Sequence, residues 1–496
     1  MKKLLILSVA GICITAFSSC KKYLEKEPDN RAKLTDPQKV SQLLASAYTQ
    51  ANYMSFAEAM SDNVDDKGAG EVDETIRNPY YFENVQNPFQ DSPDYFWTNA
   101  YLAIASANQA LEACNNAENP ALYTTQKGEA LLTRAYAHFM LVTFYSKPYN
   151  ATTAATDPGI PYVTEPETVV LKQYERKTVA YVYEMIEKDL LEGLPLLDDA
   201  SYTVPRYHFN RAAANAFASR FYLYKKDYAQ TVQYASTAVP DLLPNLRAWN
   251  TTYQTFGINN LPSEYQKTSE PANLLLVTCP SSYSYGNFFA RSRYGVTQLK
   301  IDEILGVSIA VTGGSWSFIR GTVGAQDNVA IPKFNYTDFS EDFPGANYGT
   351  PYGTICLFTT EEVLFNKAEA YTQLGNTTAA ITDLNTYMST RITGATPGAL
   401  ASNRRITESK VRAHYGNTLP IKEAMILYIL ELKRAEFLHE GVRWMDMLRY
   451  DIPVTHEFVG PGNTPVGSIT VEPDNKLRQL KLPDGVKLSG IEDLNR

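Results

Sequence analysis

The chain has 496 residues and a formal net charge of −9, with 44% hydrophobic and 20% charged residues. This composition is typical of a globular chain of one large domain or two to three ordinary domains. An excess of acidic groups repels polyphosphates, which argues against nucleic acid as a partner, whereas neutral ligands such as glycans meet no such penalty.

The first twenty residues predict export and a lipid anchor. A basic start is followed by an apolar run that ends at Phe17 and is too short to span a bilayer. Two serines then precede Cys20, as at a lipoprotein signal-peptidase site where the cysteine thiol is acylated. We expect residues 1–19 to be a signal peptide, Cys20 to be the lipidated residue and 20–36 to form a tether held on the membrane by two or three acyl chains. A plain secretory signal that contains Cys20 by chance is the alternative.

The cysteines outside the signal segment are few and far apart. Cys114, Cys279 and Cys356 are an odd, widely spaced set, which is neither a disulfide framework nor a zinc pattern. We expect each of them to be a small buried hydrophobic residue.

Helical periodicity begins at Asp36, an N-cap residue followed by proline at the first helical position. Apolar residues then recur on one face as far as Tyr48. Further amphipathic segments follow along the chain, including two helix pairs with turns at Lys226–Asp227 and at Gly375–Asn376. The expected elements are helices over 128–145 and 178–191, helix pairs over 211–239 and 361–390, and a long final helix from Ile421 to about Arg449.

The two helix pairs can be laid on each other. Ala218 is followed six residues later by Tyr224 and a short turn, and Ala368 is followed six residues later by Leu374 and a short turn. Small residues that let two helices approach, with a bulky residue closing the seam, are typical of tetratricopeptide-type hairpins. A chance likeness of two amphipathic hairpins is the alternative.

The chain changes character between Pro240 and about Thr354, and again after Tyr450. Glycine, proline, serine, asparagine and aromatic residues dominate there, with short apolar runs such as 274–277. We expect loops, short helices and a few strands beside the helical part. Structured loops on a rigid scaffold are where ligand contacts usually lie.

The last predicted helix carries a dense cluster of charged and aromatic residues that resembles the C-terminal signature of the SusD/RagB family. That signature is a glutamate followed by Glu-Gly-x-Arg-Trp-x-Asp-x-x-Arg, here Glu436, Glu440, Gly441, Arg443, Trp444, Asp446 and Arg449. Other segments are similar to family segments in the same order, so the resemblance covers nearly the whole mature chain. These segments are 20–24, 176–195, 210–228 and 369–376.

The resemblance implies a mainly all-α fold, in which tetratricopeptide-like helical hairpins support an irregular, loop-rich ligand-binding region. Four such hairpins are expected. Two are the pairs described above, and the other two would join 38–56 with 95–113 and 130–145 with 178–191. An N-terminal part, 37–240, and a C-terminal part, 241–496, would then form one integrated domain.

The resemblance also implies a function. Such proteins are lipoproteins exposed on the outer membrane that bind oligosaccharides, or in some members peptides, and pass them to a TonB-dependent, SusC-like beta-barrel. We therefore expect a nutrient-binding protein that is not an enzyme and needs no cofactor. The alternatives from other classes are a lipid-anchored glycan hydrolase and a tetratricopeptide-type scaffold for envelope proteins.

The signature cluster also invites an enzymatic interpretation, because a glycosidase needs two carboxyl groups that face each other across a sugar. Glu436 and Glu440 are instead spaced as neighbours on one helix face, beside Arg434 and Arg443. Positive neighbours keep carboxylates ionised, which is wrong for a general acid. We therefore assign the cluster to a structural network of salt bridges. The chain also contains no His-Glu-x-x-His, no Gly-x-Ser-x-Gly and no phosphate-binding loop motif.

An acidic loop has enough carboxylates to bind calcium. Its spacing does not fit an EF-hand loop, because Val64 takes the second ligand position counted from Asp62. A solvated acidic turn is the favoured interpretation, and a structural calcium ion stays open as the alternative. The acidic residues are Asp62, Asp65, Asp66, Glu71, Asp73 and Glu74.

Sugar binding requires flat aromatic faces beside hydrogen-bonding groups, because pyranose rings stack through their C–H faces while their hydroxyls need polar partners. Trp316 follows Gly-Gly-Ser in the irregular region and is the best exposed candidate, whereas Trp97, which begins a helix, is equally compatible with the core. Trp444 belongs to the signature and is excluded. The stretch upstream of Trp316 adds the candidates Tyr283, Tyr285, Phe288, Arg291 and Tyr294.

Overall fold

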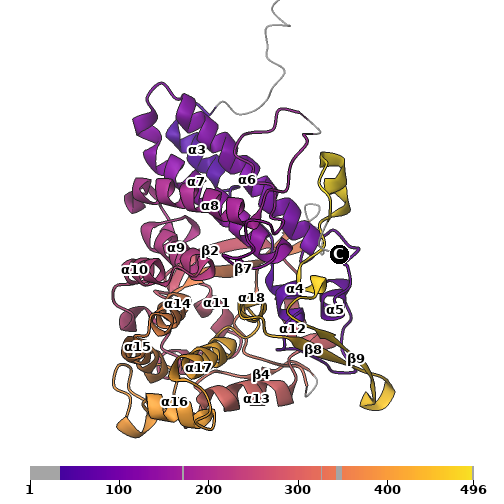
Figure 1. Ribbon diagram of the computed structural model, residues 1–496, viewed down its shortest axis with the longest axis vertical. Helices are drawn as coiled ribbons and strands as arrows, with labels where there is room; N and C mark the ends of the chain where they lie inside the picture. Colours follow the sequence, from indigo (N-terminus) through magenta and orange to yellow (C-terminus); the bar gives the residue numbers. More distant parts are fainter. Residues whose placement is uncertain (1–33, 170–171, 325–326, 342–348, 494–496) are drawn as a thin grey trace, which may run out of the picture.

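Helices stacked along one side of the molecule form its framework (Figure 1). The computed structural model describes residues 34–493 apart from 170–171, 325–326 and 342–348. The predicted signal peptide, Cys20 and most of the tether lie outside the described residues. Across the described ranges, no helix is at once long enough and apolar enough to cross a membrane. The mainly helical fold class predicted from the sequence is confirmed.

Neighbouring helices of the stack pack against each other along the chain and between its two halves. Helix α6 packs on α7 and α7 on α8, while α9 and α10 form a hairpin whose second helix packs on α14. The stacked helices are α3 (Pro37–Leu44), α6 (Pro93–Asn116), α7 (Thr124–Tyr145), α8 (Val179–Gly193), α9 (Arg211–Lys225), α10 (Tyr228–Ala238), α14 (Thr360–Gln373), α15 (Thr377–Ser389), α16 (Glu408–His414) and α17 (Ile421–Glu436).

Local capping explains why these helices begin and end where the sequence predicts. Asp36 accepts the backbone N–H of Lys39 at 3.0 Å, and Thr178, Asn210 and Asn376 cap α8, α9 and α15 in the same way. The hairpin turn after α9 takes a left-handed conformation at Lys226, with φ of +64°. The predicted helix pairs 211–239 and 361–390 are therefore present with their turns in the expected places.

A small antiparallel sheet and a set of short elements lie beside the stack (Figure 1). The central strand β7 (Gly349–Thr359) pairs with β2 (Asn273–Pro280) and β6 (Tyr336–Glu341). The predicted apolar run 274–277 is the buried part of β2. The remaining elements are α4 (Met54–Ala59), α5 (Glu74–Tyr80), α11 (Leu261–Tyr265), α12 (Phe288–Arg291), α13 (Gln298–Ile309), α18 (Val442–Arg449), β1 (Asp65–Asp66), β3 (Tyr294–Gly295), β4 (Gly321–Thr322), β5 (Val329–Ala330), β8 (Val454–Val459) and β9 (Pro465–Val471).

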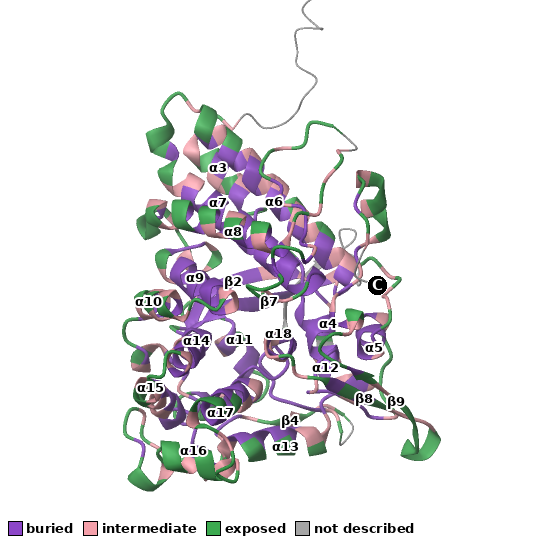
Figure 2. Ribbon diagram, viewed as in Figure 1, coloured by how far each residue is buried: buried purple, intermediate pink, exposed green. Residues whose placement is uncertain are grey.

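Burial follows this arrangement. Buried residues line the inner faces of the stack and the sheet, whereas exposed residues lie at the outer helix ends and at the tip of the β8–β9 hairpin (Figure 2). Cys114, Cys279 and Cys356 are free thiols and all are buried, as predicted.

The first expected hairpin arm, 38–56, is not one helix. Helix α3 ends at Leu44, and α4 begins separately at Met54. Between them the Asn52 side chain accepts the backbone N–H of Met54 at 2.8 Å, a local bond that competes with helix continuation. The Tyr48 ring turns inward, where its hydroxyl donates to Glu129 at 2.5 Å. The backbone therefore leaves the helical conformation after Leu44, and Tyr48 packs into the core.

The long final helix predicted from Ile421 to Arg449 is also broken. Helix α17 ends at Glu436 and α18 begins at Val442. His439 and Gly441 in between have φ of +74° and +71°, which helical backbone does not allow. A side chain on Gly441 would meet the Met54 backbone at 3.1 Å, so the glycine permits a close approach between the turn and α4.

A buried chain of ion pairs ties the lower helices of the stack to the loop after α10. Arg391, just after α15, bonds both oxygens of Glu436 on α17 at 2.9 and 3.0 Å, and also reaches Glu361 on α14 at 3.0 Å. Glu361 in turn accepts from Arg247 at 2.7 Å. All four side chains have 0% exposure. In this low-dielectric interior each charge depends on its partners.

We predict that Arg391→Met lowers the free energy of unfolding by about 3–5 kcal/mol, because it leaves Glu436 and Glu361 without a shared cation. Arg320→Met is the matched control, since Arg320 pairs with Asp302 at the surface and should cost about 1 kcal/mol or less. Denaturant unfolding of the two variants beside the parent protein measures the difference. Equal losses in the two variants would contradict a structural role for the buried chain.

Candidate functional site

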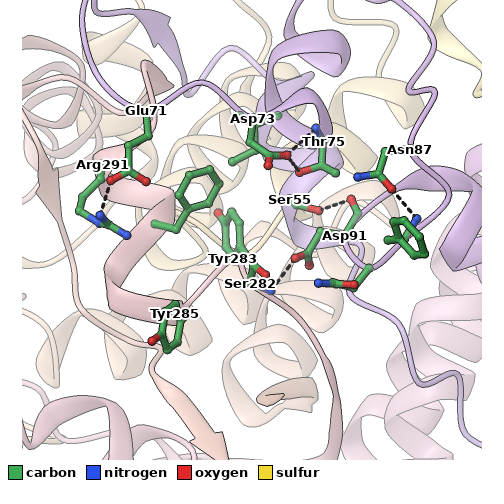
Figure 3. Close-up of a pocket in the computed structure, with 14 residues that line it drawn as sticks. Ser55, Glu71, Asp73, Thr75, Asn87, Asp91, Ser282, Tyr283, Tyr285 and Arg291 are labelled. Carbon is green, nitrogen blue, oxygen red and sulfur yellow. Dashed lines mark hydrogen bonds and ion pairs between the residues drawn. The ribbon is translucent and has the colours of Figure 1, made fainter. Parts of the chain in front are cut away.

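Three loop segments from two distant parts of the sequence meet, together with Ser55 of α4, around a pocket of about 360 Å³, here called the loop pocket (Figure 3). One segment leads into α5, the second precedes α6, and the third follows β2 and includes α12. The lining residues are Ser55, Glu71, Asp73, Thr75, Ile76, Asn87, Phe89, Gln90, Asp91, Ser282, Tyr283, Tyr285, Phe288 and Arg291.

Aromatic rings from two different segments of the loop pocket are open to solvent. Phe89 is 65% exposed and Tyr285 is 44% exposed, while Phe288 is half-buried between the other lining residues. Single exposed apolar side chains are common on folded proteins, but exposed rings grouped around one concave surface are a feature of ligand-binding grooves. Amide groups of Asn87 and Gln90 lie on the same wall as Phe89. The pocket thus combines apolar faces with hydrogen-bonding groups.

Asp91 joins two walls of the loop pocket. Its carboxylate accepts from the Ser281 hydroxyl at 2.6 Å, from the Ser282 backbone N–H at 2.7 Å and from the Asn52 amide at 3.0 Å. Burial raises the pKa of Asp91 to about 6, against the lowering effect of these hydrogen bonds. Both oxygens are occupied by donors of the protein, so the group holds the loops together rather than offering a proton to a ligand.

A second connection ties the segment before α5 to α12. Glu71 forms an ion pair with Arg291, and the backbone N–H of Glu71 donates to the Arg291 carbonyl at 3.0 Å. Asp73 caps α5, accepting from the backbone and hydroxyl of Thr75 at 2.8 and 2.6 Å. Figure 3 shows Glu71 with Arg291 on one side of the pocket and Asp73 with Thr75 at its edge.

The floor of the loop pocket rests on the turn between α17 and α18. The Tyr283 hydroxyl donates to the His439 carbonyl at 3.0 Å. Glu58 on α4 accepts the backbone N–H groups of His439 and Gly441 at 2.9 and 3.0 Å, which fixes the turn. Lys333, with a fully buried side chain, adds an ion pair to Glu440 at 2.7 Å. The signature turn therefore supports a pocket residue that is distant in sequence.

The structure brings together some of the predicted ligand-binding residues. Tyr283, Tyr285, Phe288 and Arg291 all line the loop pocket. Tyr294 instead lies in β3 and is buried, with its ring centroid 4.9 Å from that of Tyr80.

The two predicted tryptophans lie outside the loop pocket. Trp97 is 6% exposed on α6 and borders a separate apolar groove. Trp316, expected to be well exposed, is half-buried: its ring stacks on Phe318 at 4.9 Å and its indole N–H donates to the Leu305 carbonyl at 2.9 Å. These contacts correct the expected exposure of Trp316.

Sequence reasoning missed the wall formed by the turn before α6. Phe89 and Asp91 had no periodic pattern around them, and Asp73 was considered only as a calcium candidate. The available clue was a lone aromatic residue in the polar segment 86–91, directly before a helix N-cap. Asp91 takes a left-handed backbone conformation with φ of +67°, and no local sequence motif indicates this conformation.

The charged signature residues occupy separate ion pairs rather than one helix face. Because α17 ends at Glu436, the expected arrangement of Glu436 and Glu440 beside Arg434 and Arg443 is wrong. Arg443 instead bonds both oxygens of Asp62 at 2.8 Å. Burial raises the pKa of Glu440, whereas for Glu436 the charge of Arg391 outweighs burial and lowers the pKa.

The end of the signature forms a second buried group of charges. Asp446 accepts from Lys433 and from Arg449, each at 2.7 Å. Arg449 also bonds both oxygens of Glu369 on α14, at 2.8 and 3.0 Å. Trp444 is buried, with the Arg478 guanidinium 5.5 Å from its ring centroid. These contacts tie α18 to α17 and α14.

The acidic loop distributes its carboxylates among different partners. Asp66 pairs with Arg293 at 2.6 Å and Asp65 with Lys300 at 3.3 Å, while Asp62 and Glu71 pair with the arginines named above. Glu74 accepts from the Asn78 amide at 3.2 Å. Within the described part of the chain, no three acidic, histidine or cysteine side chains converge as metal ligands.

The helical stack with its small antiparallel sheet is a fold found in solved structures. A solved SusD-like carbohydrate binding protein from Bacteroides vulgatus shares it with a TM-score of 0.63 at 16% identity, over 92% of this chain and 96% of that one. A laminarin binding SusD-like protein has a TM-score of 0.54 at 16% identity, over 84% of this chain and 92% of that one. These likenesses establish the fold.

Sequence comparisons identify the family. The profile described as starch-binding associating with outer membrane matches residues 22–223, and the SusD family profile matches residues 340–481. A SusD-like protein of Formosa agariphila is 23% identical, over 93% of this chain and 94% of its own length. The chain belongs to the SusD family, as the signature predicted. The family is described as binding carbohydrate in association with the outer membrane, not as enzymatic.

We predict that the Asp62–Arg443 pair stabilises the protein above pH 4 and loses this effect in acid. Burial raises the pKa of Asp62, but the hydrogen bonds and charges of Arg443 and Arg434 outweigh it and leave the pKa at about 2, below the ordinary 3.8. A folded-state pKa below the unfolded value gives stability that is present above pH 4 and lost towards pH 2. The contribution is up to about 2 kcal/mol.

The measurement compares the free energy of unfolding from pH 5 to pH 2 for the parent protein and Asp62→Asn. The difference between them should shrink as the pH falls, because only the parent loses the ion pair. A constant difference across this range would show that Asp62 does not titrate with a lowered pKa.

Proposed function

We propose that this protein is a lipoprotein on the surface of the outer membrane that binds an oligosaccharide in the loop pocket and passes it to a TonB-dependent, SusC-like beta-barrel. The family description supports association with the outer membrane. Solved relatives described as carbohydrate binding and laminarin binding support a glycan as the ligand. The Ser-Ser-Cys sequence that ends at Cys20 supports the lipid anchor.

The observation that carries the proposal is the pair of exposed rings in the loop pocket. Phe89 and Tyr285 offer flat apolar faces, which suit the C–H faces of pyranose rings. Amide groups of Asn87 and Gln90 also line the pocket, where sugar hydroxyls need partners. The aromatic rings carry the apolar contact and the polar groups fix the orientation of the sugar.

The carboxylates of the loop pocket are arranged for ligand binding rather than for catalysis. Each carboxylate of the loop pocket has a structural role, since Asp91 holds two loops together, Asp73 caps α5 and Glu71 pairs with Arg291. None is placed as an unoccupied acid facing an unoccupied base, which glycoside hydrolysis requires. Binding followed by release to a transporter is therefore the role that this site supports best.

We predict that Tyr285→Ala and Phe89→Ala each weaken glycan binding about tenfold, the loss of about 1.4 kcal/mol expected when a central aromatic contact is truncated. The protein lacking residues 1–20 would first be screened on a glycan array, and affinities for the best glycan would be measured by calorimetry. Tyr181→Ala is the matched control, because Tyr181 is 37% exposed on α8, away from the pocket. Unchanged affinity in both pocket variants would exclude this pocket as the binding site.

We predict that the native mature protein begins at an acylated Cys20 and that Cys20→Ala releases it from the membrane. Two or three acyl chains give stable attachment, and no helix of the described residues is long and apolar enough to cross a membrane. Mass spectrometry of the native N-terminus and fractionation of the variant check this. Co-purification of a large beta-barrel with the parent protein tests the transporter partner, and an unmodified N-terminus would contradict the lipoprotein proposal.

A further inference from the structure

The charges that line the loop pocket are unbalanced. Its lining contains the carboxylates of Glu71, Asp73 and Asp91 and a single guanidinium, that of Arg291. Arg291 is already paired with Glu71, so its charge is largely cancelled within the pocket wall. No other lysine, arginine or histidine is among the lining residues. Two negative charges therefore remain without a cation in the wall.

These two charges reach the pocket in different ways. Asp73 is exposed at the pocket edge, where it accepts hydrogen bonds from Thr75 (Figure 3). Asp91 is buried below, and its partners Asn52, Ser281 and Ser282 are all neutral. The negative charge of Asp73 acts on Asp91 in the same direction as burial, raising its pKa. The charge of Asp73 is thus felt at Asp91.

A sugar that enters the loop pocket exchanges water for this environment. A neutral or amino sugar can use carboxylate oxygens as hydrogen-bond acceptors, and an ammonium group gains a favourable charge interaction. A uronate or a sulfated sugar brings acceptors to acceptors and a negative charge to negative charges, with no guanidinium left to clamp it in the bidentate manner that carboxylates favour. Repulsion of this kind is a common way to exclude the wrong ligand.

We propose that the loop pocket selects neutral or amino-sugar oligosaccharides and rejects uronate-containing and sulfated ones, with Asp73 and Asp91 as the rejecting groups. This inference rests on the proposed function, because it assumes that the loop pocket is the glycan site. It narrows the ligand class beyond what the family or the fold defines. The net charge of the whole chain alone would not give this result, since a basic pocket can exist in an acidic protein.

The first test is the charge of the glycans that bind. The protein lacking residues 1–20 is applied to an array that holds neutral, amino, uronate and sulfated oligosaccharides, and the best ligand is then compared with the same oligosaccharide after oxidation of its primary hydroxyls to carboxylates. We expect neutral or amino sugars among the ligands and at least tenfold weaker binding of the oxidised form. Raising the salt concentration should narrow this gap, because screening weakens repulsion.

The second test uses variants that change charge while keeping local structure. Asp73→Asn retains an N-cap side chain for α5, and we expect the affinity for the oxidised oligosaccharide, relative to the affinity for the neutral one, to rise about threefold. Glu71→Gln should act in the same direction, because Arg291 then adds a positive charge to the pocket. Asp227→Asn is the matched control, since Asp227 caps α10 in the same manner at a remote exposed site.

The outcomes separate the inference from the proposed function. Binding of uronate or sulfated glycans as tight as that of neutral ones, or no gain in either pocket variant, would overturn the charge selection while leaving the glycan site intact. Absence of binding to any glycan on the array would instead overturn the proposed function and the inference with it. A gain in Asp227→Asn equal to that in Asp73→Asn would trace the effect to overall charge and contradict the local assignment.

Discussion

The buried chain of charges that runs from Glu436 through Arg391 and Glu361 to Arg247 is the constraint on which the structure most depends. All four groups have lost their water, so each needs the position of the next to within hydrogen-bonding distance. Apolar packing between helices is close but not directional. Charges that must meet in a dry interior add a directional requirement to the packing of α14, α17 and the segment after α15.

The end of α17 is connected to the loop pocket. The turn after α17 is fixed by Glu58 and by Lys333, and it supports Tyr283 from below. Asp91 then connects the Tyr283 segment to the turn that carries Phe89. The pocket therefore consists of flexible types of structure, loops and short turns, held by polar contacts to rigid helices. This division explains how exposed rings can keep a defined spacing without being buried themselves.

Features encoded by neighbouring residues were predictable from the sequence, whereas features encoded by distant residues were not. Asp36 before proline and the turn at Lys226 indicate their helices locally, and part of the aromatic stretch 283–294, predicted as a ligand region, lines the loop pocket. The break after Glu436 depends on Glu58, nearly four hundred residues earlier in the chain, and only Gly441 hinted at it. Trp316 was misjudged because its covering partners, Phe318 and the Leu305 carbonyl, follow from tertiary packing. Phe89 was missed because no periodic pattern surrounds it, and its place beside the pocket also follows from tertiary packing.

The hydrogen bond between Asp91 and Ser282 has a consequence for the stage of folding at which the loop pocket is complete. These residues are 191 positions apart, so the two pocket walls meet only after the intervening helices and β2 have taken their places. A chain emerging from the ribosome carries Phe89 long before Tyr285 exists beside it. The loop pocket is therefore complete only in the fully folded molecule.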